Sequence, residues 1–244
     1  VDESTTELRF YEYCFDEDII VAGVIDLFHR AIRKGRQFDC LQIAKCTGRV
    51  DEIIQATASL DMFGEISVEG DSEDLSQHLS LRAFWSIGAA MISNKRLAKV
   101  ALFDMEMTRQ QAAALGAGLI TSNSQHFKKF CMTRIAFADG AITELASGFK
   151  QNSSLRLLNV DGCDIGDAEL AELVGGMGSH PSLKTLSLWQ NRGQKHALVA
   201  LGKVLASRSC QVEELDYSGQ DRLTGWLGIL AQGLQWNESL THLD

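Results

Sequence analysis

The segment DGCDIGDAELAE has the outline of a calcium-binding EF-hand loop. Asp161 stands first in it, Gly166 sixth and Glu172 twelfth, and such a loop places a ligand, a turn glycine and a second ligand at these positions. The loop also needs oxygen ligands at the third and fifth positions, because calcium takes about six to eight oxygens. Cys163 and Ile165 occupy those positions and supply no side-chain oxygen. The segment therefore predicts no calcium site.

No other arrangement of reactive side chains predicts catalysis or cofactor binding. The six cysteines form no CxxC or CxxH pair, which argues against a zinc site and a redox pair and favours reduced thiols. The six histidines are scattered along the chain, and we find no GxGxxG after an expected strand, no GxxxxGK[ST], no HExxH and no GxSxG. We expect no enzyme activity and no bound metal or cofactor.

The charge argues against nucleic acid and membranes as partners. A formal net charge of -9, from 23 basic and 32 acidic residues, repels nucleic acid and anionic lipid. The chain lacks an apolar run of about 18 residues, and its N-terminus, VDESTTELRF, does not resemble a signal peptide. We expect a cytoplasmic protein. The sequons that begin at Asn152 and Asn237 match a glycosylation pattern that is short enough to arise by chance.

A repeated pattern runs along the chain. The segments SLRLLNV, SLKTLSL, QVEELDY and SLTHLD place apolar residues at the first, fourth and, where the chain reaches it, sixth positions of LxxLxL, starting at residues 155, 183, 212 and 240. The pattern also starts near residues 127, 97, 63, 38 and 8, where Leu8, Tyr11 and Tyr13 are expected to point inward. The mean period is roughly 29 residues, as in repeat architectures. No linker interrupts it, so we expect one domain over residues 1–244.

A segment with helical spacing follows each LxxLxL segment. Ala168, Leu170 and Ala171 begin one such set, and Leu223 and Leu227 begin another. The end of each LxxLxL segment alternates as a short strand with one buried face would. Strands separated by helices at this period are parallel, because each helix carries the chain back across the sheet. The glycines of ALGAGLI are expected to allow close helix packing.

The sequence resembles the leucine-rich repeat family, specifically its ribonuclease-inhibitor-like subtype, over nearly its whole length. The resemblance implies an α/β solenoid of horseshoe shape, with about eight repeats of roughly 28–29 residues, a parallel sheet on the concave face and helices on the convex face. In that family the ninth position of each unit holds Asn, Cys or Thr, whose side chain bonds backbone groups in the bend after the strand. Cys46, Cys163 and Asn191 match this position, whereas Met105 and Ile135 depart from it and predict irregular bends.

Residues at the third, fifth and seventh positions of LxxLxL are expected to point out from the concave strand face. Seven of these residues are our candidates for contact with a partner protein: Phe103, Lys129, Asn159, Asp161, Trp189, Glu214 and Asp216. Exposed aromatic side chains such as Trp189 are enriched among binding hot spots. The acidic residues near the C-terminal end favour a partner with a basic surface. The sequence thus predicts a non-enzymatic protein–protein interaction scaffold.

Two alternative functions rest on fold resemblance alone. Ran GTPase-activating proteins share this long-repeat fold, although none of their functional residues can be matched to this sequence. The sensing repeat region of intracellular immune-type receptors is the second alternative. The segment SLTHLD stops partway through an expected strand, and neither end of the chain resembles a polar cap. We therefore expect a fragment of a longer repeat protein, or the product of a truncated gene model, whose uncapped repeats would allow end-to-end association.

Overall fold

The computed structural model describes residues 6–71, 79–121, 126–178, 180–220 and 227–244. Within these residues, nine parallel strands form one sheet: β1 (Glu7–Tyr11), β3 (Phe38–Ala44), β5 (Phe63–Glu69), β6 (Lys99–Met107), β7 (Lys129–Phe137), β8 (Leu157–Asn159), β9 (Thr185–Ser187), β10 (Glu214–Asp216) and β11 (His242–Leu243). The strands β2 (Cys14–Phe15) and β4 (Thr47–Gly48) form a small second ladder. The helices are α1 (Asp18–Arg33), α2 (Val50–Ala58), α3 (Leu81–Ser93), α4 (Arg109–Thr121), α5 (Ala141–Gln151), α6 (Asp167–Met177), α7 (Lys195–Leu205) and α8 (Leu227–Leu234).

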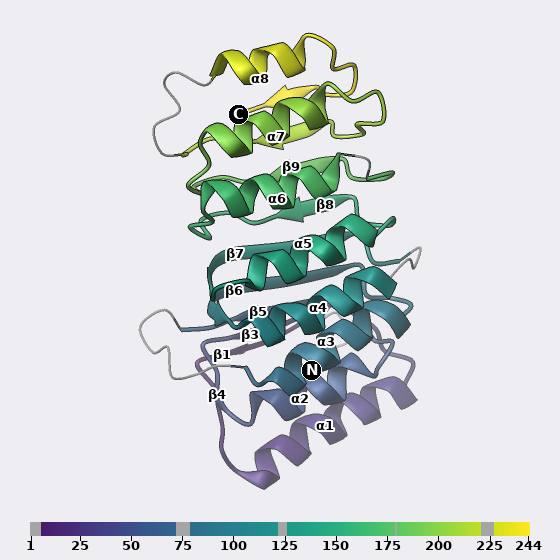
Figure 1. Cartoon of the computed structure of the whole chain (residues 1–244). Coiled ribbons are helices and arrows are strands. Elements are labelled where there is room, and N and C mark those ends of the chain that lie inside the picture. Colours follow the sequence, from purple (N-terminus) through teal and green to yellow (C-terminus); the bar gives the residue numbers. More distant parts are fainter. Residues whose placement is uncertain (1–5, 72–78, 122–125, 179, 221–226) are drawn as a thin grey trace.

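The helices and the large sheet form two layers that run the length of the molecule. Figure 1 shows the helices stacked in front of the strands, from the purple N-terminal repeats to the yellow C-terminal ones. A helix is about 10 Å wide, whereas neighbouring strands lie about 4.8 Å apart, so the helical layer is the longer one and the sheet lies on the concave side. This is a leucine-rich-repeat solenoid, and it confirms the fold class expected from the sequence.

The core lies between the two layers and is built by the apolar residues of the repeat. Strand pairing brings one such residue from each of seven successive strands into a single row: Leu41, Ile66, Val100, Phe130, Leu158, Leu186 and Leu215. All of them are buried. Burial of one such side chain contributes about 1.5–3 kcal/mol, and each row member is covered by its neighbours on both sides. The stability of a repeat therefore depends on the repeats next to it.

The register predicted for the first repeat is wrong. Leu8 pairs with Leu41, the fourth residue of the next unit and not its first, so the strand is shifted along the pattern. Tyr11 and Tyr13, which were expected inside, are 60% and 45% exposed, whereas Phe10 packs against the core. The spacing of Leu8, Tyr11 and Tyr13 satisfies LxxLxL equally well, and tyrosine has a polar hydroxyl that favours a partly wet position. Apolar spacing alone could not separate the two registers.

The ninth-position side chains point into the bends, as the resemblance implied. The thiol sulfurs of Cys46 and Cys163 lie 3.3–3.5 Å from backbone carbonyl oxygens. The side chain of Asn191 donates to the carbonyl oxygen of Val160 at 2.9 Å and accepts from the N–H of Ile165 at 3.0 Å. These contacts satisfy backbone groups that the bend would otherwise leave unpaired.

The middle repeats, where irregular bends were expected, differ from the others in having longer strands. Met105 and Ile135 lie opposite each other in β6 and β7, are buried, and let both strands continue past the ninth position. The preceding residues, Asp104 and Arg134, have φ angles of 51° and 53°. Lys45 and Gln190 have the same left-handed conformation at this position of their repeats, so the turn itself is regular, and the pairing of β6 with β7 beyond it distinguishes the middle repeats.

A second side-chain turn, which the repeat pattern did not predict, joins α5 to β8. The Oδ1 atom of Asn152 accepts from the N–H groups of Ser154 at 2.9 Å and Leu155 at 2.8 Å. Its Nδ2 donates to the carbonyl oxygen of Leu119 at 2.7 Å. Because Asn152 is buried and its amide is engaged on both sides, the first sequon is part of a structural turn.

The same turn recurs three residues before the first apolar position of other units. Asn94 and Asn237 accept from two backbone N–H groups and donate to a carbonyl oxygen of an earlier repeat. His180 takes this place in another repeat and accepts through Nδ1. The second sequon, at Asn237, therefore also belongs to a turn.

The glycines of α4 allow helices to pack backbone to backbone, as expected. A Cβ atom on Gly118 would lie 2.6 Å from the Cα of Gly88 in α3, and one on Gly148 in α5 would lie 2.8 Å from the Cα of Gly116. These distances leave no room for a side chain. The glycines therefore set the close spacing of α3, α4 and α5.

The expected helical faces differ from the structure in two details. Ala168 was expected to pack inward and is exposed, because the buried face of α6 is formed by Leu170, Leu173, Val174 and Met177. Ala171 is half-buried. In the last unit Leu227 is exposed, and Leu223 lies outside the described residues. The deeper leucines of each set hold their helix on the core.

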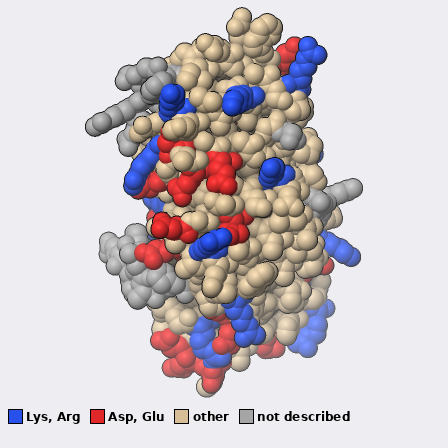
Figure 2. All heavy atoms as spheres, viewed as in Figure 1, with Lys and Arg blue, Asp and Glu red and all other residues tan. Residues whose placement is uncertain are grey.

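Asp167, at the start of α6, links two repeats. Its carboxylate accepts from the backbone N–H groups of Gln194 at 2.7 Å, His196 at 2.9 Å and Ala197 at 2.9 Å, at the beginning of α7. Burial alone would raise the pKa of Asp167, but these hydrogen bonds and that of the His196 ring lower it. Figure 2 shows carboxylates gathered over the middle repeats on the side where the helices begin, as the helix dipole favours.

Candidate functional site

The structure brings most of the candidate partner-binding residues together on the strand face. Five of them lie on β8, β9 and β10 or directly after these neighbouring strands: Asn159, Asp161, Trp189, Glu214 and Asp216. The other two, Phe103 and Lys129, lie on β6 and β7. The strand face of the C-terminal repeats is therefore the candidate site, and the middle repeats adjoin it.

Several hydrogen bonds of this site converge on the carboxylate of Asp161. One carboxylate oxygen accepts from the hydroxyl of Ser187 at 2.6 Å and from the backbone N–H of Trp189 at 3.0 Å. The other oxygen accepts from the amide of Asn159, which itself accepts from Thr133 at 3.3 Å. Asp161 therefore connects β8 with β9 and positions the backbone of Trp189, and Asn159 extends these contacts to Thr133 on β7. The place of Asp161 on the strand face followed from the sequence, but this positioning role did not.

Trp189 presents an aromatic surface near Asp161. Its side chain is 38% exposed, and its indole nitrogen lies close to Gly219, where an added Cβ would come within 3.2 Å of it. Gly219 has a φ angle of +70°, a conformation that favours glycine. The bend of the next repeat thus supports one edge of the indole, and part of the side chain remains exposed.

Two further carboxylates lie on β10, the strand that pairs with β9. Glu214 is exposed and accepts from the hydroxyl of Thr185 at 3.0 Å. Asp216 is half-buried, and its Oδ1 atom accepts from the N–H of Ser218 at 2.9 Å and from the Ser218 hydroxyl at 2.7 Å. These hydrogen bonds hold each carboxylate in place. The site is therefore rigid, negative and partly aromatic.

The middle of the strand face has a different character. Lys99 forms an ion pair with Glu65 at 2.8 Å, and Lys129 is exposed on the neighbouring strand. Burial alone would lower the pKa of Lys99, but the hydrogen bond and charge of Glu65 raise it. Burial, reinforced by the charge of Glu65, raises the pKa of Cys40 to about 11, and burial raises that of Cys131. Both thiols are thus protonated at neutral pH and are poor nucleophiles.

An ion pair at the rim of the strand face was missed by the sequence reasoning. The guanidinium of Arg134 contacts both carboxylate oxygens of Asp104, at 2.5 and 2.6 Å. This contact and the charge of Asp104 raise the pKa of Arg134. Both residues occupy the eighth position of their units, next to the departures from the family pattern at Met105 and Ile135. Those departures were the signal available in the sequence.

The segment with the outline of a calcium loop forms a bend and a helix start. Cys163 and Ile165 are buried, and burial raises the pKa of Cys163 to about 12. The carboxylate of Asp161 is engaged by its neighbours, as described above. Among the described residues, no group of three or more His, Cys, Asp or Glu side chains is arranged to hold a metal ion. All six cysteines are free.

Comparison with known proteins finds similarity among solved structures. No family model matches the sequence, and no curated protein matches it. The chain is similar to the crystal structure of an internalin (inlF) from Listeria monocytogenes, with 12% sequence identity and a TM-score of 0.43 over 95% of this chain. The chain spans 58% of the length of that structure. In the described part of the chain, no helix is long and apolar enough to span a bilayer.

Proposed function

We propose that this protein is a non-enzymatic interaction scaffold that binds a basic segment of a partner protein on the strand face of its C-terminal repeats. One observation carries the proposal: Trp189, which is 38% exposed, follows β9, and the strand or bend on either side carries carboxylates, Asp161 after β8 and Glu214 and Asp216 on β10. The long units with a full helix in each support the ribonuclease-inhibitor-like subtype, in which the strand face is the concave one.

The chemistry of this site suits the side chains of lysine and arginine. A cation over the face of an indole is stabilised by about 0.5–2 kcal/mol, depending on how far it is desolvated. Glu214 and Asp216 supply carboxylates that a guanidinium or ammonium group can approach. The net charge of -9 steers a basic segment toward the protein and repels an acidic one.

The middle repeats complete the surface that we assign to the partner. Lys129 is exposed one strand before β8, where it would meet an acidic residue of the partner. Phe103 is half-buried on β6 and offers an apolar contact. A partner segment that crosses the strands from Phe103 to Glu214 would thus present an apolar residue first, an acidic residue next and basic residues last.

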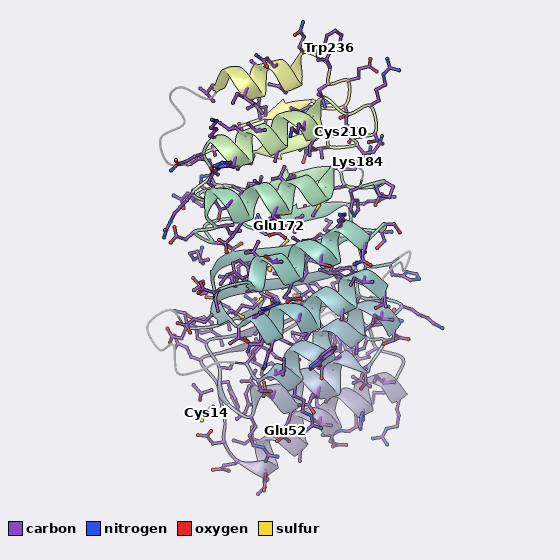
Figure 3. The ribbon with its side chains drawn as sticks, in the orientation of Figure 1. Cys14, Glu52, Glu172, Lys184, Cys210 and Trp236 are labelled. Atoms are coloured by element: carbon purple, nitrogen blue, oxygen red, sulfur yellow. The ribbon has the colours of Figure 1, made fainter. Side chains whose placement is uncertain are left out.

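Calorimetric titration with a peptide rich in lysine and arginine tests the proposal. We expect binding that weakens as salt is added, because exposed charge pairs are screened. Trp189→Ala and Asp216→Asn should each weaken it by about tenfold or more, as hot-spot substitutions do. Glu172→Gln is the matched control, because Glu172 is an exposed carboxylate on α6, on the helical layer (Figure 3).

Two results would overturn the assignment. The first is equal affinity of the basic peptide for the Trp189→Ala variant and the wild-type protein. The second is tighter binding of an acidic peptide of matched length, since the carboxylates would then have no role in recognition.

A further inference from the structure

A row of apolar side chains on α3 faces solvent on the opposite side of the molecule. Leu81, Trp85, Ala89 and Ile92 follow one another at intervals of about one helical turn, and all four are exposed, with Trp85 at 52%. The buried face of the same helix packs on the core. We call these four residues the α3 stripe. Isolated apolar side chains are common on protein surfaces, but a contiguous apolar patch marks a contact site.

The neighbouring helix extends this patch. Ala113, Ala117 and Ile120 of α4 are half-buried, and neither α3 nor α4 contains an aspartate or a glutamate. Their basic residues are Arg82 and Arg109, both in the first turn of their helix. Figure 2 shows a largely uncharged expanse over the middle of the helical layer. Such a surface offers no ionic partner to a strongly acidic or basic protein.

We propose that the α3 stripe is the contact surface for a second copy of this chain, with the two α3 helices antiparallel across a two-fold axis. The local charge of the patch permits this occupant. Each copy carries a net charge of -9, yet the patch itself holds no carboxylate, so two copies can meet there without burying like charges. A charged partner would instead have to desolvate its own groups without compensation.

The order of large and small side chains also favours a second copy. Read along α3, the stripe is large, large, small and large, and an isologous contact requires a surface that fits its own reverse. In the antiparallel arrangement, Trp85 of one copy lies over Ala89 of the other, and Leu81 lies beside Ile92. The axial steps from Leu81 to Trp85 and from Ala89 to Ile92 are about 6.0 and 4.5 Å at 1.5 Å per residue. The two stripes therefore stay in register along the contact.

The size of the patch limits the strength of this association. A stable interface takes about 800 Å² from each partner, and a fully covered tryptophan contributes about 150–250 Å² of that area. The α3 stripe and the exposed parts of α4 supply only a share, so we expect a dissociation constant in the micromolar range. The helices cover one face of the sheet (Figure 1), and the strand face is the opposite one. Pairing through α3 therefore leaves the strand face of each copy open.

Sedimentation equilibrium of the full chain over a range of about 1 to 100 µM tests the proposal. We expect a monomer–dimer equilibrium that Trp85→Ala weakens by about 10- to 100-fold. Trp236→Ala is the matched control, since Trp236 is an exposed tryptophan beyond the end of α8 (Figure 3), and it should leave the equilibrium unchanged. All substituted positions are exposed, so the variants should keep the wild-type circular dichroism spectrum and unfolding midpoint.

A size swap tests the antiparallel register. Ala89→Trp alone places two tryptophans against each other and should abolish the dimer. The double variant Trp85→Ala with Ala89→Trp again sets a large residue over a small one and should restore it. The proposal is overturned by a wild-type chain that stays monomeric throughout, by a dimer that persists in Trp85→Ala, or by a swap that fails to restore pairing. Binding of a monomeric chain to phosphatidylcholine vesicles through Trp85 would assign the stripe to lipid and would also overturn it.

Discussion

Replacing His180 with asparagine probes the side-chain turn between helix and strand, because three other repeats have asparagine in this place. The Nδ1 atom of His180 accepts from the N–H groups of Ser182 at 3.4 Å and Leu183 at 3.1 Å. An accepting Nδ1 carries no proton, so the ring is neutral and its proton is on Nε2. That atom is buried and has no partner among the described residues. Burial lowers the pKa of His180.

The lowered pKa makes the protein less stable in acid. As the pH falls through about 6.5, the unfolded chain takes up a proton on this histidine, whereas the folded chain does so only at a lower pH. Between these two values the free energy of unfolding falls by up to about 1.4 kcal/mol per pH unit. The stability that depends on the neutral ring is fully present above about pH 6.5 and is lost as the pH falls toward the folded pKa.

Urea unfolding of wild type and His180→Asn, from about pH 8 to about pH 5, measures this effect. Asparagine keeps an acceptor for both N–H groups and cannot be protonated. At about pH 8 the variant should lie within about 1 kcal/mol of wild type, and its stability relative to wild type should rise below about pH 6.5. His180→Ala, which leaves both N–H groups unpaired, should cost about 1–3 kcal/mol at about pH 8, and this cost should shrink below about pH 6.5 as the wild type loses stability. A wild-type-minus-Asn difference that stays flat over this range refutes the buried neutral imidazole.

The remaining stability predictions concern contacts between repeats. Asp167→Ala should cost about 1–2 kcal/mol of unfolding free energy, because it removes the carboxylate that caps α7. Since the pKa of Asp167 is lowered, this contribution should be present above about pH 4 and disappear as the pH falls through the lowered pKa. Urea titrations in which the variant loses no stability at neutral pH would contradict this prediction. Gly118→Ala should cost about 1–3 kcal/mol of unfolding free energy, because the added Cβ clashes with Gly88. In Gly175→Ala the added Cβ meets no atom within 4 Å, so this variant should gain up to about 1 kcal/mol from helix propensity. Equal thermal midpoints for the two variants would show that the close packing of the helices is unimportant. Tyr217→Phe should maintain or raise the thermal midpoint, because the Tyr217 hydroxyl is buried without a partner among the described residues; a drop of several degrees contradicts this.

Apolar spacing was enough to predict the strands, the helices and the inward residues of most repeats. Leu158 and Leu186, for example, pair and are buried as expected. It failed at Tyr11 and Tyr13, where two registers satisfied the same pattern and only the pairing with the next strand decides between them. The spacing of apolar residues predicts which side chains are buried, but it does not determine the register in which neighbouring strands pair.

The polar contacts between repeats were harder to predict. The turn at Asn152 depends on a carbonyl oxygen of Leu119 in an earlier repeat. The signal for this turn in the sequence was the recurrence of asparagine three residues before the first apolar residue of a unit. The exposed position of Trp189 followed from its place in LxxLxL. The role of Asp161 did not, because it depends on which groups of β8 and β9 meet at its carboxylate.

The signals of the four tryptophan indole N–H groups in a nitrogen–proton correlation spectrum test the central claim most directly. Tryptophan-to-phenylalanine variants assign the signals, and the lysine- and arginine-rich peptide is then titrated into the full chain. Binding on the strand face predicts a saturable shift of the Trp189 signal while those of Trp85 and Trp236 stay in place. A Trp189 signal that does not move while the peptide binds would contradict the account.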